Sequence, residues 1–261
     1  MNAHSIATRT AFYLLIAIYL VMWAGGIGSH LLRGAPPTNA SWASPLFLFL
    51  SGLIVFVTTA KNDWWKLLVI GLLGLTAEAV GVQSGFLFGV YRYTSVLQPQ
   101  LLGVPVVMAC AWFVLVAYLR QMLQPFRLPA WLDVLVAGAW MTAIDLVIDP
   151  LAAGQLGYWR WEQAGDYYGI PARNFAGWFV VSLVIFTAVR KPWRLNAAAI
   201  YLGLSMVVFF TAISFAHNLM LAFGIGLGLC ATHFIVAQVA RSGGRLINPA
   251  TSGAHLSKQL L

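Results

Sequence analysis

Residues 197–215 read AAAIYLGLSMVVFFTAISF and contain no charged side chain. An apolar run of about 20 residues is long enough to cross the hydrocarbon core of a bilayer as an α-helix. Six further apolar runs precede this one and one follows it. We therefore predict an all-α, polytopic membrane protein of about eight transmembrane helices, at residues 11–32, 44–60, 65–82, 103–120, 131–150, 175–190, 197–215 and 219–240.

The composition leaves no room for a water-facing surface. Hydrophobic residues make up 61% of the 261 residues and charged residues 8%, whereas a soluble domain carries about 25% charged residues. No soluble domain or low-complexity tract separates the spans, so we expect residues 1–261 to form a single integral membrane domain. The net charge of +8 is spread over loops, which argues against nucleic acid as a partner. Cys110 and Cys230 lie inside spans, where we expect packing residues rather than a disulfide.

The distribution of basic residues predicts the orientation. Cytoplasmic loops of membrane proteins carry an excess of Lys and Arg. With eight spans, one side of the membrane receives four arginines, which are Arg33, Arg92, Arg160 and Arg173. The side with both tails receives eleven basic residues, which are Arg9, Lys61, Lys66, Arg120, Arg127, Arg190, Lys191, Arg194, Arg241, Arg245 and Lys258. We therefore expect a protein of the cell membrane with both termini in the cytoplasm and with an uncleaved first span, which is longer than the apolar core of a signal peptide.

Two long loops on the non-cytoplasmic side resemble each other. Each contains Gly-x-aromatic-Arg-aromatic, at 89–93 and 157–161, and then Gly-[Val/Ile]-Pro, at 103–105 and 169–171. The two copies are offset by 68 residues at the first motif and 66 at the second. We expect an internal repeat of two spans, related by an axis along the membrane normal, that covers residues 65–120 and 131–190.

Acidic residues precede both loops. Ionisable side chains inside a span are costly and are by default functional candidates. Glu78 lies before the first loop, and Asp145 and Asp149 lie before the second, four residues apart and therefore on one helix face. We expect Pro150 to end that helix. Asp133 begins a span, where it suits a helix N-terminus and is interpreted as structural.

A purely structural interpretation of the three acids is ion pairing with Arg92, Arg160 or Arg173. Three carboxyl groups at one depth, beside two loops rich in Tyr and Trp, instead favour a reactive site. No lysine lies in mid-span, which excludes a retinal Schiff base, and no paired histidine spacing supports a di-iron hydroxylase or desaturase. Nucleotide-binding loops are also missing from the sequence, so we expect neither a metal nor another cofactor.

A set of motifs between residues 70 and 180 resembles a known family. The motifs are Glu78-x-x-Gly81, Gly85-Phe-Leu-Phe-Gly89-Val-Tyr-Arg-Tyr93, Gly103-Val-Pro105, Asp145-x-x-x-Asp149-Pro150, Gly157-Tyr-Trp-Arg-Trp161, Tyr168-Gly-Ile-Pro171 and Asn174-Phe-x-Gly-Trp178. Together they resemble the membrane carotenoid hydratases of bacteria and archaea, which include gamma-carotene/lycopene 1,2-hydratase and bisanhydrobacterioruberin hydratase. The flanking spans agree with that family in hydropathy only.

The resemblance implies a hydro-lyase of carotenoid biosynthesis that works without a cofactor. It implies addition of water to the terminal C1=C2 double bond of an acyclic carotenoid end group, of the lycopene or gamma-carotene type, to give a tertiary alcohol. An alkene is a weak base, so the reaction needs a well-placed acid. We expect Asp149 or Asp145 to donate the proton, and Glu78 and Asn174 to orient the water.

Protonation at C2 leaves a tertiary cation at C1, which aromatic faces stabilise by about 0.5–2 kcal/mol per contact. The carotenoid would reach this site laterally from the lipid bilayer, and other carotenoid-pathway enzymes are possible partners. The residues expected to line the substrate site are Tyr91, Arg92, Tyr93, Trp159, Arg160, Trp161, Tyr168 and Trp178.

Two other classes of protein fit part of the pattern. Intramembrane acids and a parallel repeat also suit a proton-coupled small-molecule transporter, although its acids would be spread through the membrane depth. The Asp145-x-x-x-Asp149 spacing also suits a membrane prenyltransferase that binds Mg²⁺ and a diphosphate. Such enzymes usually carry two aspartate-rich motifs, and this sequence shows one.

Overall fold

The computed structural model describes residues 3–36 and 40–247 of the chain. Within these ranges the chain forms eight α-helices, which confirms the predicted all-α, polytopic membrane fold. Their bounds are α1 (Ala3–Arg33), α2 (Ala43–Thr58), α3 (Trp64–Ser84), α4 (Met108–Leu123), α5 (Ala130–Asp149), α6 (Ala172–Ala188), α7 (Ala197–Ala216) and α8 (Met220–Ile247). Lys258, which was counted for the orientation, lies outside the described residues.

The helices differ in length and in apolar character. Five segments of the described chain are long and apolar enough to cross a membrane, and they correspond to α1, α3, α5, α7 and α8. The helices α2 and α6 are shorter but apolar. The helix α4 is the central one, because every residue from Val114 to Leu123 is buried and it packs against α2, α3, α5 and α7. A helix that is apolar on all sides belongs in such a core.

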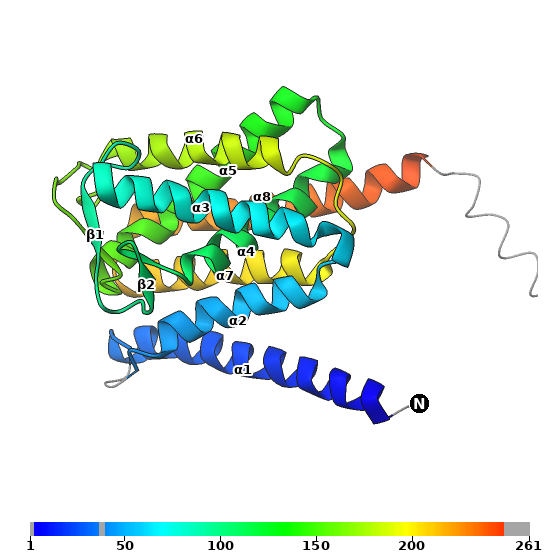
Figure 1. Ribbon diagram of the computed structural model, residues 1–261, viewed down its shortest axis with the longest axis horizontal. Helices are drawn as coiled ribbons and strands as arrows, with labels where there is room; N and C mark the ends of the chain where they lie inside the picture. Colours follow the sequence, from blue (N-terminus) through cyan, green and yellow to red (C-terminus); the bar gives the residue numbers. More distant parts are fainter. Residues whose placement is uncertain (1–2, 37–39, 248–261) are drawn as a thin grey trace, which may run out of the picture.

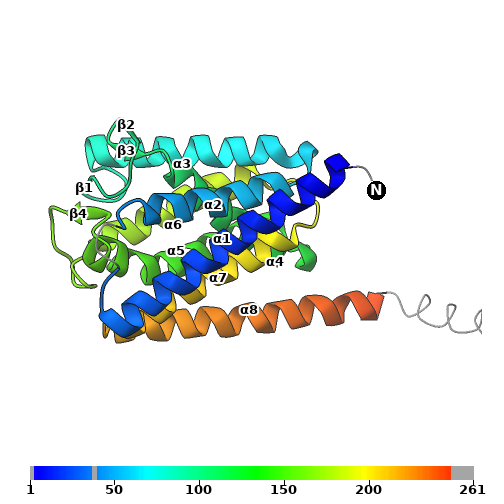
Figure 2. The same cartoon turned by 90° about the horizontal axis from the view of Figure 1, so that it is seen from below.

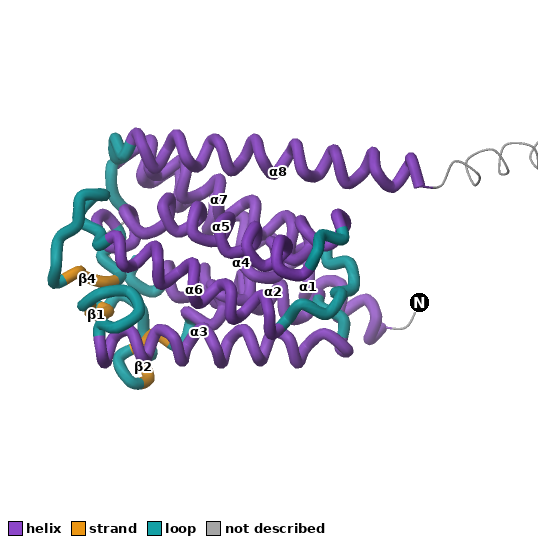
Figure 3. Tube along the Cα trace, turned by 90° about the horizontal axis from the view of Figure 1, so that it is seen from above, coloured by secondary structure: helices purple, strands orange, loops and turns teal. Residues whose placement is uncertain are grey.

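The helices run roughly side by side, and the two ends of the bundle differ (Figures 1 and 2). The long loops and the strands gather at one end, called here the strand end. The start of α1 and the end of α8 lie at the opposite end, called here the terminal end (Figure 3 shows α8 along the outside of the bundle). The first described residues of α1 and the last of α8 therefore lie at the same end of the bundle, as an even number of spans requires.

Three helix boundaries differ from the sequence prediction by five residues or more. The helix α1 begins at Ala3 instead of residue 11, and α8 ends at Ile247 instead of residue 240. The fourth span was expected from residue 103, but α4 begins at Met108, because β2 (Gln100–Leu101) and β3 (Val104–Pro105) pair as a hairpin. The helix α5 ends at Asp149, before Pro150 as predicted, but the chain continues as a π-helical turn, η3 (Pro150–Gln155). Proline lacks an N–H group and is tolerated in the first turn of a helical segment, so it does not end the helical path here.

The predicted repeat is confirmed in the two long loops. The first has a two-residue turn with φ of 53° at Leu102 and 78° at Gly103, and the second has φ of 52° at Tyr168 and 81° at Gly169. Positive φ at both central residues defines the tight hairpin turn that favours glycine. The residues flanking the two turns also pair in the same way, Leu101 with Val104 and Tyr167 with Ile170.

The two copies meet in a small sheet. The strand β1 (Tyr91–Tyr93) pairs antiparallel with β4 (Trp159–Trp161), and Arg92 lies opposite Arg160. An antiparallel pair with equivalent residues opposite each other has a local two-fold axis between them. Superposition of the whole helical segments 65–120 and 131–190 stays a prediction.

Three residues interpreted as structural are packed accordingly. Asp133 is buried in the first turn of α5, as expected, and also forms an ion pair with Arg120 of α4. Cys110 and Cys230 are free thiols, as expected.

Candidate active site

Three buried carboxyl groups lie near the strand end. Glu78 comes from α3, and Asp145 and Asp149 come from α5; their exposed fractions are 3%, 2% and 1%. In the described part of the chain none of the three forms an ion pair, and Arg92 pairs instead with Glu162 at the surface. The interpretation in which these acids pair with arginines is therefore wrong.

Asn174 joins the two aspartates. It lies in the first turn of α6, and its buried amide Nδ2 donates to Asp145 Oδ2 at 2.8 Å and to Asp149 Oδ2 at 2.7 Å. The other oxygen of Asp149, Oδ1, accepts a 2.7 Å hydrogen bond from the indole Nε1 of Trp159. Each oxygen of Asp149 therefore accepts one N–H, and such donors stabilise negative charge on a carboxylate.

Glu78 is held by two phenols of the first loop. Its Oε2 accepts hydrogen bonds from the hydroxyl of Tyr91 at 2.6 Å and from that of Tyr93 at 2.9 Å. Burial, together with the Glu78 charge, raises the pKa of both Tyr91 and Tyr93 above the usual value of a phenol. Both phenols therefore stay protonated and act as donors to the carboxyl group.

The strand pairing builds an aromatic wall over the acids. Side chains alternate between the two faces of a strand, so Tyr91, Tyr93, Trp159 and Trp161 point inward. Their rings are in contact: the centroids of Tyr91 and Trp161 lie 5.0 Å apart and those of Tyr93 and Trp159 lie 5.7 Å apart.

The same alternation corrects two predicted substrate contacts. Arg92 and Arg160 are the middle residues of their strands and point outward to an exposed surface. The aromatic-Arg-aromatic motif therefore forms a strand with its aromatic residues on the inner face and its arginine on the outer face. Tyr168 is also misplaced in the prediction, because it is 42% exposed and its hydroxyl accepts from the backbone N–H of Leu221.

Trp178, which was expected to line the substrate site, contacts Trp112 of α4. Its ring stacks on that of Trp112 of α4, with centroids 4.5 Å apart and planes inclined by 15°. Trp112 is fully buried and approaches Glu78. The buried indole N–H groups of Trp112 and Trp161 meet no acceptor with good hydrogen-bond geometry in the described residues, but they lie near Glu78 and Asp149, respectively. The sequence does not predict Trp112 as a site residue, because a tryptophan inside an apolar span gives no indication of which side chains it contacts.

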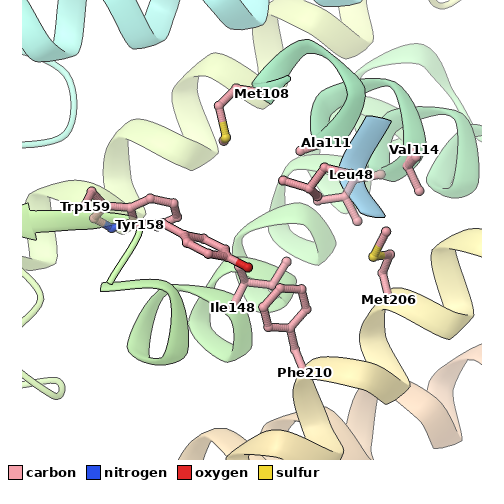
Figure 4. A pocket seen from close by; sticks show the side chains of 10 residues that line it. Leu48, Met108, Ala111, Val114, Ile148, Tyr158, Trp159, Met206 and Phe210 are labelled. Carbon is pink, nitrogen blue, oxygen red and sulfur yellow. The ribbon is translucent and has the colours of Figure 1, made fainter. Parts of the chain in front are cut away.

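An apolar cavity of about 50 Å³ lies beside Trp159 and Ile148 (Figure 4). Trp159 lines it while donating to Asp149, and Ile148 lines it from the position before Asp149. The opposite wall comes from α2, α4 and α7, which lie far apart in the sequence. The full lining is Leu48, Met108, Ala111, Val114, Leu115, Ile148, Tyr158, Trp159, Met206 and Phe210.

The donor set around the aspartates does not suit a divalent cation. Magnesium prefers carboxylate oxygens with free lone pairs and several waters, whereas both oxygens of Asp149 face N–H groups. Across the described ranges, no three or more His, Cys, Asp or Glu side chains are grouped so that they could hold a metal ion. This arrangement does not favour the prenyltransferase alternative.

Comparison with known proteins gives two matches. Residues 43–238 match the family model described as "Carotenoid biosynthesis protein". The bisanhydrobacterioruberin hydratase of Haloarcula japonica is 34% identical over 140 residues, which are 51% of this chain and 47% of that protein. The match thus spans about half the length of this curated relative. No solved structure matches the chain.

Proposed function

The chain belongs to the carotenoid biosynthesis protein family, and we propose that it is a hydratase that adds water to the terminal C1=C2 double bond of an acyclic carotenoid. The observation that carries the proposal is the buried pair Asp145 and Asp149, bridged by Asn174 and placed between an aromatic wall and an apolar cavity. The name of the Haloarcula relative supports hydration as the reaction.

The aspartate pair supplies the proton. Two carboxyl groups that share a donor and a buried space hold one proton between them more readily than two negative charges. Asp149 is the member beside the cavity, so it delivers the proton to C2 of the alkene. The N–H groups of Trp159 and Asn174 then stabilise the carboxylate that forms. The pair, which includes Asp145, stays without its proton until the proton lost by the attacking water returns to it.

The positive charge develops at C1, next to the aromatic wall. The faces of Trp159, Tyr93 and Tyr91 stabilise a tertiary cation and keep bulk water away from it. Glu78 is the acceptor: water attacks C1, its C–O bond forms, and the proton that it loses passes to the carboxylate. Exchange with water returns this proton to the aspartate pair, so the net change is the addition of one water molecule.

The end group of the carotenoid occupies the apolar cavity, and the rest of the polyene extends between helices into the lipid. Apart from Tyr158 and Trp159 the cavity is lined by aliphatic residues, Met and Phe, which suits an isoprenoid end; at about 50 Å³ it must widen to admit that end (Figure 4). The three acids lie near one end of the bundle instead of along its depth, and this favours a hydratase over a proton-coupled transporter.

The first test is expression of the chain in a bacterium that accumulates lycopene. We expect a more polar pigment to form, and to form equally well in anaerobic membranes with a chelator, because the reaction uses water, protons and side chains alone. A pigment change that requires oxygen or a reductant would mean that the hydroxyl group has another source. An unchanged pigment profile, with the protein present in the membrane, would contradict hydration of lycopene.

We also propose that both termini are cytoplasmic, so that the strand end faces the other side of the membrane. The excess of basic residues toward the terminal end supports this orientation. A reporter enzyme that works only in the cytoplasm should be active when fused to the C-terminus, and one fused within the loop at 163–166 should be inactive. The reverse pattern would exclude this orientation.

A further inference from the structure

We propose that the terminal end contains a binding site for a phosphate group, built from Arg120, Arg127 and Arg190, and that it takes the headgroup of an anionic lipid or a free phosphate. A pocket of about 530 Å³ lies between the end of α4, the start of α5 and the segment that links α6 to α7. These three arginines and Asp133 are its charged lining residues.

The charge of the pocket is not balanced by the protein. Arg120 pairs with Asp133, whereas Arg127 and Arg190 are exposed and form no ion pair in the described part of the chain. Three arginines against one carboxylate leave the lining with a net charge of +2. The pocket at the strand end, of about 540 Å³, differs in charge, because there Glu162 pairs with one of two arginines.

Arg120 shows that the site is built rather than incidental. It is 3% exposed and its Nη1 donates a hydrogen bond to Asp133. Its Nε has no hydrogen-bond partner within the described residues. A buried guanidinium is costly unless its donors are paired, and Asp133 accounts for Nη1 of Arg120 but not for Nε. Its planar fork of donors suits the oxygens of a phosphate.

The wall that carries Arg190 is fixed in place. Gln124 binds both backbone groups of Trp193, accepting from its N–H at 3.0 Å and donating to its carbonyl at 3.1 Å. Lys66 donates to the carbonyl of Pro192 at 2.7 Å. A segment held by such bonds keeps the pocket open without a ligand, so binding costs little ordering entropy.

The position of the pocket points to a ligand of the membrane surface. It lies where several spans end, and Trp131 is exposed beside it, as interfacial tryptophans are. Basic pockets between helices at a membrane face bind phosphate headgroups. An anionic phospholipid can therefore enter from the lipid, while a free phosphate would enter from the water.

The test is a thermal unfolding series on the purified full-length protein in neutral detergent. Short-chain phosphatidylglycerol should raise Tm in a saturable way, and phosphatidylcholine of equal chain length should not, because only the former is anionic. The double variant Arg127→Gln/Arg190→Gln should need about tenfold more phosphatidylglycerol for the same shift. Arg241→Gln, which removes a charge from the exposed surface of α8, should respond like the wild type.

Inorganic phosphate at matched ionic strength separates the two sources. A shift that phosphate also produces, and that the double variant also loses, assigns the site to phosphate from solution. A shift with phosphatidylglycerol alone assigns it to the lipid. Equal responses of the wild type, the double variant and Arg241→Gln would overturn the proposal. Tm without lipid should agree among the three proteins, because Arg127, Arg190 and Arg241 are exposed.

Discussion

Replacing Asp149 with Asn is expected to lower carotenoid hydration by about 10²–10⁴-fold, with the upper end favoured because an alkene is a poor base. The amide has the shape of the carboxyl group but cannot deliver a proton to C2. Asp145→Asn should be equally or less damaging, since it leaves Asp149 beside the cavity but removes the second member of the pair. Pigment conversion per unit of membrane-inserted protein is the measurement.

The matched control is Asp166→Asn, the same change at an exposed aspartate in the second long loop. It should leave conversion near the wild-type level. If Asp149→Asn and Asp145→Asn both convert lycopene normally per folded molecule, the aspartate pair is not the acid and its role is structural. Loss of protein from the membrane without loss of activity per molecule would lead to the same conclusion.

Glu78→Gln is expected to lower hydration by about 10²–10³-fold, because the amide cannot accept the proton that water loses. The variant should still protonate the alkene, so the cation formed by Asp149 should lose a proton again and give isomerised or unchanged carotenoid. The ratio of hydrated to isomerised pigment is therefore the most informative readout.

Two further variants make this result specific. Tyr91→Phe with Tyr93→Phe removes both hydrogen bonds to Glu78 and should lower hydration less than Glu78→Gln does. Glu162→Gln makes the same change at the surface partner of Arg92 and should have little effect. If Glu78→Gln hydrates lycopene at the wild-type rate, the water is activated elsewhere.

Most of the fold is predictable from the sequence because hydropathy dictates it. All eight spans are found, and most of their boundaries lie within three residues of the expected positions, since the cost of exposing polar backbone to lipid requires helices there. The repeat is also readable, because Gly103 and Gly169 occupy turns that require positive φ. The predicted start of α4 was wrong, because strands of two residues each, such as β2 and β3, are too short to show a periodic pattern in the sequence.

The site was partly predictable. Ionisable residues inside spans are rare enough to stand out, and Asn174 follows from its motif, so the acids and their bridging amide were found. The strand alternation that turns Arg92 outward was not recognised, because three residues are too few to show a period of two. Contacts between distant helices, such as that of Trp112 with Trp178, depend on packing that a single sequence does not reveal.

The most direct test of the central claim is the anaerobic membrane assay with lycopene, run in heavy water. Protonation at C2 followed by capture of water at C1 predicts a tertiary alcohol that carries one deuterium at C2, in the wild type but not in Asp149→Asn. A hydroxylated product without deuterium at C2, or one that forms only when oxygen is admitted, would contradict hydration by the buried carboxyl groups.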